Sequence, residues 1–91
     1  MDWKFVVIWE FHVRPGNEHR FEEIYGSDGE WARLFRSSEG YCGTELNRDF
    51  KVSLRYVTLD FWTSRDDYLR FREEHQAEYQ VIDQRCERLT E

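Results

Sequence analysis

Two segments of the chain alternate between side chains of two kinds, as β-strands do. Every odd-numbered residue from Trp3 to Val13 is apolar. From Val52 to Trp62 the even-numbered positions form a second such face, with Tyr56, Thr58 and Asp60 among them. A period of two predicts that each segment is a strand with one face toward a core. The opposite faces are also partly apolar, through Val6, Ile8, Val57, Leu59 and Phe61.

The segment after the first strand carries apolar residues at helical spacing. They are Phe21, Ile24, Tyr25, Trp31, Leu34 and Phe35. Gly26 and Gly29 interrupt this pattern, and Ser27 with Glu30 has the S-x-x-E spacing of a capping box. We therefore expect two helical pieces, with a kink or a fresh start near Gly26 to Ser27.

The second strand is followed by another helical pattern. Thr63 and Ser64 are typical helix caps, and an apolar stripe continues from Tyr68 to Leu89. One uninterrupted helix would be about 37 Å long at 1.5 Å per residue, longer than a small sheet. We therefore expect a bend near Glu74 to Glu78.

A shorter strand is predicted at Glu39 to Asp49, where Gly43 indicates a bulge or a close backbone approach. The resulting order is strand, broken helix, strand, strand, helix in a single domain over residues 1–91. It matches a ferredoxin-like α+β fold, with an antiparallel sheet, helices on one face and the fourth strand missing. Because helices cover one face only, we expect a homodimer that packs the other face on its copy.

Charge and composition exclude several partners. With 13 basic and 19 acidic residues the net charge is −6, which disfavours nucleic acid and anionic membranes. The apolar run from Phe5 to Trp9 is too short for an export or membrane segment. Cys42 and Cys86 have no C-x-x-C spacing and are interpreted as free thiols, so a cytoplasmic location is expected. The three histidines have no metal-binding spacing, and no metal site is predicted.

Four stretches together resemble one known family. They are VVIWEFHVRPGNEHRFEEIYG, GEWARLF, GYCGTEL and YVTLDFWTSRDDYLRF. In order and spacing they resemble the antibiotic biosynthesis monooxygenase-like (ABM) domains, which form dimeric α+β barrels. The resemblance implies oxygenation of polycyclic phenols to quinones without a cofactor in some members, haem cleavage in others, and no established activity in many.

The resemblance also implies site residues. Quinone-forming members line their pocket with an Asn, a Trp four residues later and a Tyr six residues after that. Trp62 and Tyr68 match the last two, and Thr58 stands at the Asn position. Haem-degrading members need an Asn on the first strand and a Trp and a His on the second helix. The corresponding positions here fall at Trp9, near Phe71 and near Val81, so haem degradation is the weaker alternative.

From the residues themselves, Asp60 is the main candidate for chemistry. A buried carboxylate must pair locally or face a pocket, where desolvation would raise its pKa and make it a general base. His75, on the helical stripe beyond Tyr68, is an alternative proton acceptor. We assign Tyr68 to hydrogen-bond a substrate oxygen and Trp62 to stack on the substrate. Further predicted substrate contacts are Thr58, Tyr56, Trp9, Trp31 and Phe35.

Two function classes stay open. One is a cofactor-independent monooxygenase that acts on a polycyclic aromatic or phenolic small molecule. The other is a non-catalytic ligand-binding or structural dimer in which the tryptophans pack solidly. A cavity between sheet and helices distinguishes them, because a fused-ring substrate needs several hundred Å³.

Overall fold

The structure is a computed structural model that describes residues 3–91. It contains a three-stranded antiparallel sheet with strand order β1-β3-β2. This confirms the ferredoxin-like α+β arrangement predicted from the sequence. The elements in chain order are β1 Phe5–His12, α1 Glu18–Tyr25, α2 Glu30–Phe35, β2 Tyr41–Arg48, β3 Arg55–Trp62, α3 Arg65–Glu74 and α4 Gln76–Cys86.

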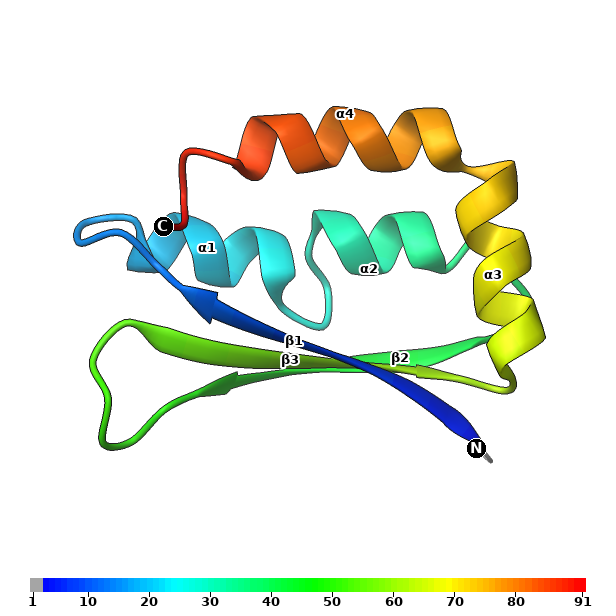
Figure 1. Ribbon diagram of the computed structural model, residues 1–91, viewed down its shortest axis with the longest axis horizontal. Coiled ribbons are helices and arrows are strands. Elements are labelled where there is room, and N and C mark those ends of the chain that lie inside the picture. Colours follow the sequence, from blue (N-terminus) through cyan, green and yellow to red (C-terminus); the bar gives the residue numbers. More distant parts are fainter. Residues whose placement is uncertain (1–2) are drawn as a thin grey trace.

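All the helices lie on one side of the sheet (Figure 1). α1 and α2 follow each other along the sheet, α4 runs alongside them, and α3 stands at the end where β3 finishes. The opposite face of the sheet carries no helix (Figure 1). This one-sided covering is what the count of helical segments predicted.

β3 is the central strand, and its alternation is complete. Tyr56, Thr58, Asp60 and Trp62 are buried under the helices, whereas the residues between them are only half-buried. The strand begins at Arg55, so the prediction that it starts at Val52 is wrong. Residues 52–54 belong to a turn, in which Leu54 adopts a left-handed φ of 67°.

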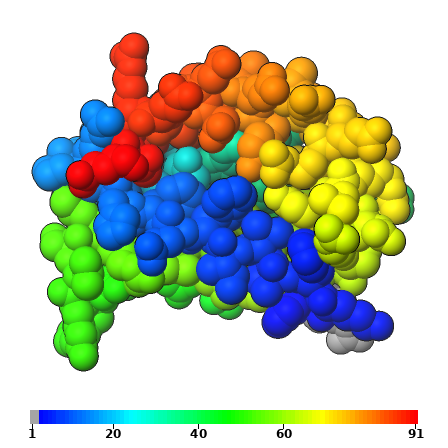
Figure 2. Space-filling view, viewed as in Figure 1, coloured from blue at the N-terminus to red at the C-terminus, as the bar shows by residue number. Residues whose placement is uncertain are grey.

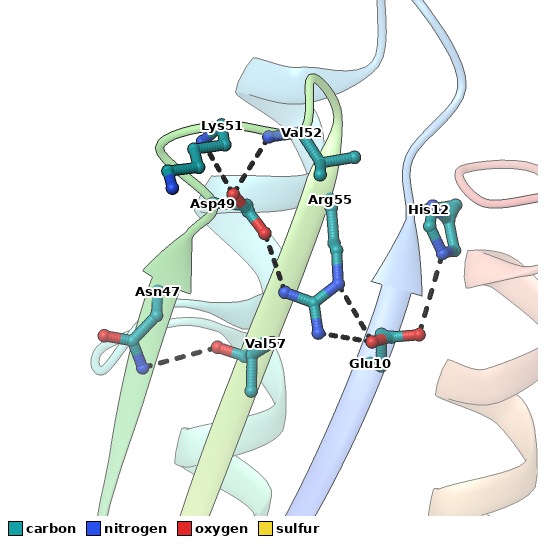
Figure 3. Close-up of polar contacts among 8 residues, drawn as sticks. All are labelled: Glu10, His12, Asn47, Asp49, Lys51, Val52, Arg55 and Val57. Atoms are coloured by element: carbon teal, nitrogen blue, oxygen red, sulfur yellow. Dashed lines mark hydrogen bonds and ion pairs between the residues drawn. The ribbon is translucent and has the colours of Figure 1, made fainter.

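A charged cluster holds this turn on the bare face of the sheet (Figure 3). The Asp49 carboxylate accepts hydrogen bonds from the backbone N–H groups of Lys51 and Val52, at 2.7 and 2.9 Å. Arg55 donates to Asp49 at 2.8 Å and also to Glu10 on β1. The turn extends further than the alternation predicted, to Leu54, because Asp49 satisfies its backbone donors.

The first helical region is broken as expected, but its cap is not. α2 begins at Glu30 with Gly29 as its N-cap, and no side chain caps it, so the predicted Ser27–Glu30 capping box is wrong. A Cβ at Gly29 would lie 2.3 Å from the Ile24 carbonyl oxygen. Close contact of the loop with the end of α1 therefore sets the start of α2.

The other predicted irregularities are confirmed. β2 has a register shift between Tyr41 and Gly43, and Gly43 has a φ of 140°. Ser64 caps α3 by accepting a hydrogen bond from the Asp67 N–H at 3.0 Å. The long C-terminal helix breaks at His75, inside the predicted interval.

Within residues 3–91 no fourth strand forms. The chain after α4 returns to the end of β1, where Val13 and Thr90 make an isolated bridge. The Leu89 carbonyl accepts from the Arg14 N–H at 2.8 Å. No helix in the described part of the chain is long and apolar enough to cross a membrane.

Candidate functional site

A cavity of about 250 Å³ lies between the sheet and the helices. On the side of β1, Figure 2 shows a recess between β1 (blue) and α4 (orange), with α2 (teal) visible inside it. Aromatic rings make up most of the wall. The lining residues are Trp9, Phe11, Tyr25, Trp31, Phe35, Thr44, Thr58, Asp60, Arg72, Tyr79 and Asp83.

The floor of the cavity is made of short side chains. Thr58 and Asp60 point inward from β3, and Thr44 stands directly opposite Asp60 on β2. Neighbouring inward positions on β3 carry the large rings of Tyr56 and Trp62. Because Thr44, Thr58 and Asp60 are short, the space between them and the aromatic side chains of the helices is not filled.

Asp60 is the one buried carboxylate in this floor, with 6% of its surface exposed. Its Oδ1 accepts a hydrogen bond from the Thr44 hydroxyl at 2.8 Å. Among residues 3–91 no basic group lies within ion-pair distance of it. Burial without a cation raises the Asp60 pKa to about 6, although the Thr44 hydrogen bond opposes the rise. Asp60 is therefore mostly ionised at neutral pH yet able to take up a proton.

A second hydroxyl extends this contact. The Tyr41 hydroxyl lies 2.6 Å from the Thr44 oxygen. Because the single Thr44 proton is donated to ionised Asp60, Tyr41 must be the donor to Thr44. The three groups form a chain whose direction reverses when Asp60 is protonated and donates instead.

The helix side of the cavity presents a guanidinium group. Arg72 of α3 donates to the Tyr68 hydroxyl at 2.9 Å, and its Cζ lies 4.0 Å from the centre of the Tyr79 ring. Burial raises the pKa of Tyr79 to about 12, so its hydroxyl remains protonated. The cavity therefore has a buried carboxylate on its sheet side, and on its helix side a cation together with the exposed carboxylate of Asp83.

Two tryptophans frame the cavity in different ways. Trp9 is 41% exposed, although its neighbours on the inner face of β1 pack in the core. Trp31 is buried against Tyr79, with ring centres 4.7 Å apart, and its Nε1 has no hydrogen-bond partner in the described structure.

Five of the predicted site residues line the cavity. These are Asp60, Thr58, Trp9, Trp31 and Phe35. The other four, Trp62, Tyr68, His75 and Tyr56, do not lie on its wall. Their predicted roles remain predictions, and their surroundings differ from those expected.

The Trp62 and Tyr68 rings are packed rather than open to the cavity. Trp62 has no exposed surface and contacts Phe35, Tyr41, Tyr68 and Phe71, with ring centres 5.3 to 5.6 Å apart. The Tyr68 hydroxyl is occupied by Arg72. Trp62 therefore does not line this cavity, and its role as a stacking wall stays a prediction.

His75 and Tyr56 also have local partners. The His75 ring lies 3.3 Å from the Ser37 hydroxyl and 2.9 Å from Glu78, at the junction of α3 and α4. The Tyr56 hydroxyl donates to Glu22 of α1. Neither group is directed at the carboxylate of Asp60.

The sequence interpretation missed several lining residues, above all Arg72 and Thr44. Arg72 lies four residues after Tyr68 on α3, a spacing that places these two on one helix face, whereas its contact with Tyr79 of α4 depends on the break at His75. In the sequence it begins the charged run Arg72-Glu73-Glu74, and such runs on helices usually face solvent. Thr44 is identified only once the register of β2 against β3 is known.

No group of three or more potential metal ligands occurs among residues 3–91. The polar groups of the cavity are one buried carboxylate, one exposed carboxylate, hydroxyls and a guanidinium.

The fold defines an α+β subunit of the ferredoxin-like class, with an aromatic cavity under its helices. The family model for antibiotic biosynthesis monooxygenase (ABM) matches residues 4–80, and the chain belongs to this family. No curated protein and no solved structure matches it. Membership indicates a monooxygenase-like or ligand-binding domain.

Proposed function

We propose that the protein is a cofactor-independent monooxygenase that oxidises a phenolic aromatic small molecule in this cavity. The observation that carries the proposal is Asp60, a buried carboxylate without a cation, set among aromatic rings. Membership of the ABM family supports the reaction class. A base with a pKa near 6 is ionised at neutral pH and matched to an acidic phenol.

In the proposed reaction, Asp60 takes one proton from the substrate and leaves a delocalised anion. That anion transfers electrons to O₂, a C–O bond forms, and the proton on Asp60 passes to the peroxide. Loss of water from the hydroperoxide leaves one oxygen atom in the product as a carbonyl. The substrate itself supplies the electrons, and the protein contributes position and electrostatics.

The surrounding residues have supporting roles in this proposal. Thr44 holds the Asp60 carboxylate, while Trp9, Trp31 and Phe35 contact the substrate rings. Asp60 is preferred over His75 as the proton acceptor because His75 is bound to Ser37 and Glu78 away from the cavity. Tyr68 acts through Arg72 rather than by touching the substrate, and Trp62 supports the site from the adjoining core.

Oxygen uptake with anthrone-type phenols tests the proposal. We expect Asp60→Asn to lower turnover by roughly 10²- to 10⁴-fold, the range for loss of a general base. Asp66→Asn, an exposed carboxylate at the start of α3, is the matched control and should keep full activity. An Asp60→Asn variant that consumes oxygen at the wild-type rate would overturn the assignment.

A ligand-binding domain without oxygenase activity is the second candidate. The observation that favours it is the packing of Trp62 and Tyr68, the residues that match the family's catalytic pair, outside the cavity. It predicts quenching of tryptophan fluorescence by aromatic ligands with no oxygen consumption. Haem degradation is not favoured, because Phe71 at the position of the required Trp is buried in the core.

We further propose that two copies pack through the bare face of the sheet. This face presents Val6, Ile8, Val57, Leu59 and Phe61, and Ile8 is 61% exposed. Trp3 packs on Phe61, with ring centres 4.9 Å apart, and remains half exposed. The β2–β3 hairpin projects past this face (Figures 1 and 2), and Phe50 near its tip is 95% exposed. A second copy would cover these apolar groups.

Sedimentation at micromolar concentration tests the dimer. Leu59→Glu on the bare face should give a monomer, because a stable interface buries about 800 Å² per partner and tolerates no unpaired central charge. Leu69→Glu, on an exposed position of α3, is the control and should leave the dimer intact. A wild-type monomer at this concentration would overturn the proposal. The cytoplasmic location expected from the sequence remains a prediction.

A further inference from the structure

Arg72 is a cation on the cavity wall that lacks a carboxylate partner. Among residues 3–91 no acidic group lies within 4.0 Å of its guanidinium nitrogens. Its only hydrogen bond within the described structure goes to the Tyr68 hydroxyl. The side chain is half-buried and lines the cavity.

The guanidinium is held in a defined orientation. It lies over the Tyr79 ring at 4.0 Å and near the Tyr68 ring at 5.9 Å, and Tyr68 fixes one of its nitrogens at 2.9 Å. A guanidinium carries five N–H donors in a planar fork that suits a carboxylate. Most of these donors therefore remain available in a half-buried site.

The other charges around the cavity restrict where an anion can bind. Asp60 lies on the sheet side, and Asp83 of α4 lines the same cavity from an exposed position. The protein as a whole also carries a net charge of −6. Both carboxylates repel an anionic group, and among the described residues Arg72 is the one cation in the cavity lining that can hold it.

We propose that the cavity binds an aromatic carboxylic acid whose carboxylate pairs with Arg72, while its rings stack among Trp9, Trp31 and Phe35. This inference deepens the proposed function, because it names the substrate class of the same cavity. In this orientation the far end of the ring system, with its phenolic group, faces Asp60 and Thr44 on the sheet. Arg72 is thus a specificity-determining residue, and the proton is removed at the opposite end.

The dimensions of the cavity fit such a ligand. Its volume of about 250 Å³ lies just below the roughly 300 to 1,000 Å³ typical of sites for drug-sized molecules. A small fused-ring acid fits this space better than a large conjugate. Because the wall is largely aromatic, a charged group without Arg72 would be desolvated at a high free-energy cost.

Binding of hydroxynaphthoic acid and of the matching hydroxynaphthamide tests the inference, with quenching of tryptophan fluorescence as the readout. The two probes share shape and phenol and differ only in the charge of one group. We expect the wild-type protein to bind the acid at least tenfold more tightly than the amide. Added salt should reduce this preference.

Arg72→Gln should abolish the preference for the acid, and Arg72→Lys should keep part of it, because lysine preserves the charge but not the fork. Arg65→Gln is the matched control: it removes the same charge from the same helix at an exposed position outside the cavity. Thermal unfolding of each variant establishes that it is folded, and Arg72→Lys keeps the test decisive if Arg72→Gln unfolds.

The outcomes separate this inference from the proposed function. Equal binding of acid and amide by the wild type, or an acid preference that survives in Arg72→Gln, would overturn the inference. If the acid preference depends on Arg72 but no substrate consumes oxygen, the inference stands and the monooxygenase proposal fails. If neutral anthrones drive oxygen uptake and the protein has no preference for acids, the monooxygenase proposal stands and the inference fails.

Discussion

The inner face of β3 has a packed C-terminal end and a hollow centre, although one strand makes both. At its C-terminal end, Trp62 is completely enclosed by rings from α2, β2 and α3. Two and four residues earlier, Asp60 and Thr58 are almost as buried, but a cavity lies above them. The difference follows from side-chain length: large rings fill the space under the helices, whereas Thr and Asp leave it open.

The comparison teaches that burial alone does not identify a site. Trp62 and Asp60 have similar exposed fractions, 0% and 6%, yet one belongs to solid core and the other to a cavity floor. What distinguishes them is the set of neighbours on adjacent strands. Asp60 has short Thr44 on one side, whereas Trp62 has Tyr41.

The largest expected effect comes from removing a ring at the packed end. Trp62→Ala should lower the free energy of unfolding by about 3 to 5 kcal/mol, because it leaves a large void among rings that cannot close it. Trp9→Ala, at the partly exposed mouth of the cavity, should cost under about 1 kcal/mol but weaken the binding of aromatic ligands. Urea unfolding measures both variants. Equal losses of stability would mean that Trp62 and Trp9 are packed alike.

The next effect concerns the charge of Asp60 at the hollow centre of β3. The folded-state pKa of Asp60, about 6, lies above its ordinary value of 3.8, so the folded protein holds a proton that the unfolded chain has released. The contribution of Asp60 to stability should therefore fall as pH rises from about 4 to 6 and stay constant above. The full change corresponds to about 3 kcal/mol.

Urea unfolding at pH 4 and pH 7 for wild type and Asp60→Asn isolates this contribution. Other carboxylates, such as Glu10 and Asp49, have pKa values below their ordinary range and act in the opposite sense, so the difference between the proteins is the relevant quantity. Asp60→Asn should gain stability relative to wild type as pH rises. A difference that does not change with pH would contradict burial of an unpaired carboxylate.

Much of the frame was predictable because it depends on local periodicity. The alternation of β1 and β3 and the bulge at Gly43 follow from residues close in sequence, whereas the helix break near His75 was expected from the length of the helix relative to the sheet. The errors arose where one particular side-chain or backbone contact decides, which the apolar periodicity does not encode. The turn before Arg55 depends on the side chain of Asp49, and the start of α2 depends on the contact of Gly29 with Ile24.

The site was predictable in part for the same reason. Asp60 and Thr58 were identified because alternation places them inward on a central strand. Trp62 was assigned to the pocket, but whether a ring faces a cavity depends on which rings other elements bring to it. Arg72 is not among the predicted site residues, because nothing in the sequence separates it from the charged helix residues that usually face solvent.

Filling the hollow centre of β3 should affect ligand binding more than stability. Thr58→Leu adds apolar volume to the cavity floor, and substitutions of this kind usually change stability by about 1 to 3 kcal/mol only when the core is already full. Here we expect a smaller change and a loss of aromatic-ligand affinity of at least tenfold, about 1.4 kcal/mol. Thr58→Val preserves the shape and should bind normally. Unchanged affinity in Thr58→Leu would place the ligand elsewhere.

The smallest effect expected is that of Thr44→Val, which keeps the shape of the side chain and removes the hydroxyl between Tyr41 and Asp60. Its loss should lower the free energy of unfolding by about 1 kcal/mol at neutral pH, the usual net value of one hydrogen bond. The hydrogen bond from Thr44 lowers the Asp60 pKa, so the variant should have a higher pKa than the wild-type value of about 6. The pH at which oxygen uptake reaches half its maximum should move upward with it.

Thr58→Val, on the same floor but without a hydrogen bond to Asp60, should leave that pH unchanged. An unchanged midpoint in Thr44→Val would show that Thr44 does not set the pKa of Asp60, and that Thr44 contributes only its shape to the hollow centre of β3.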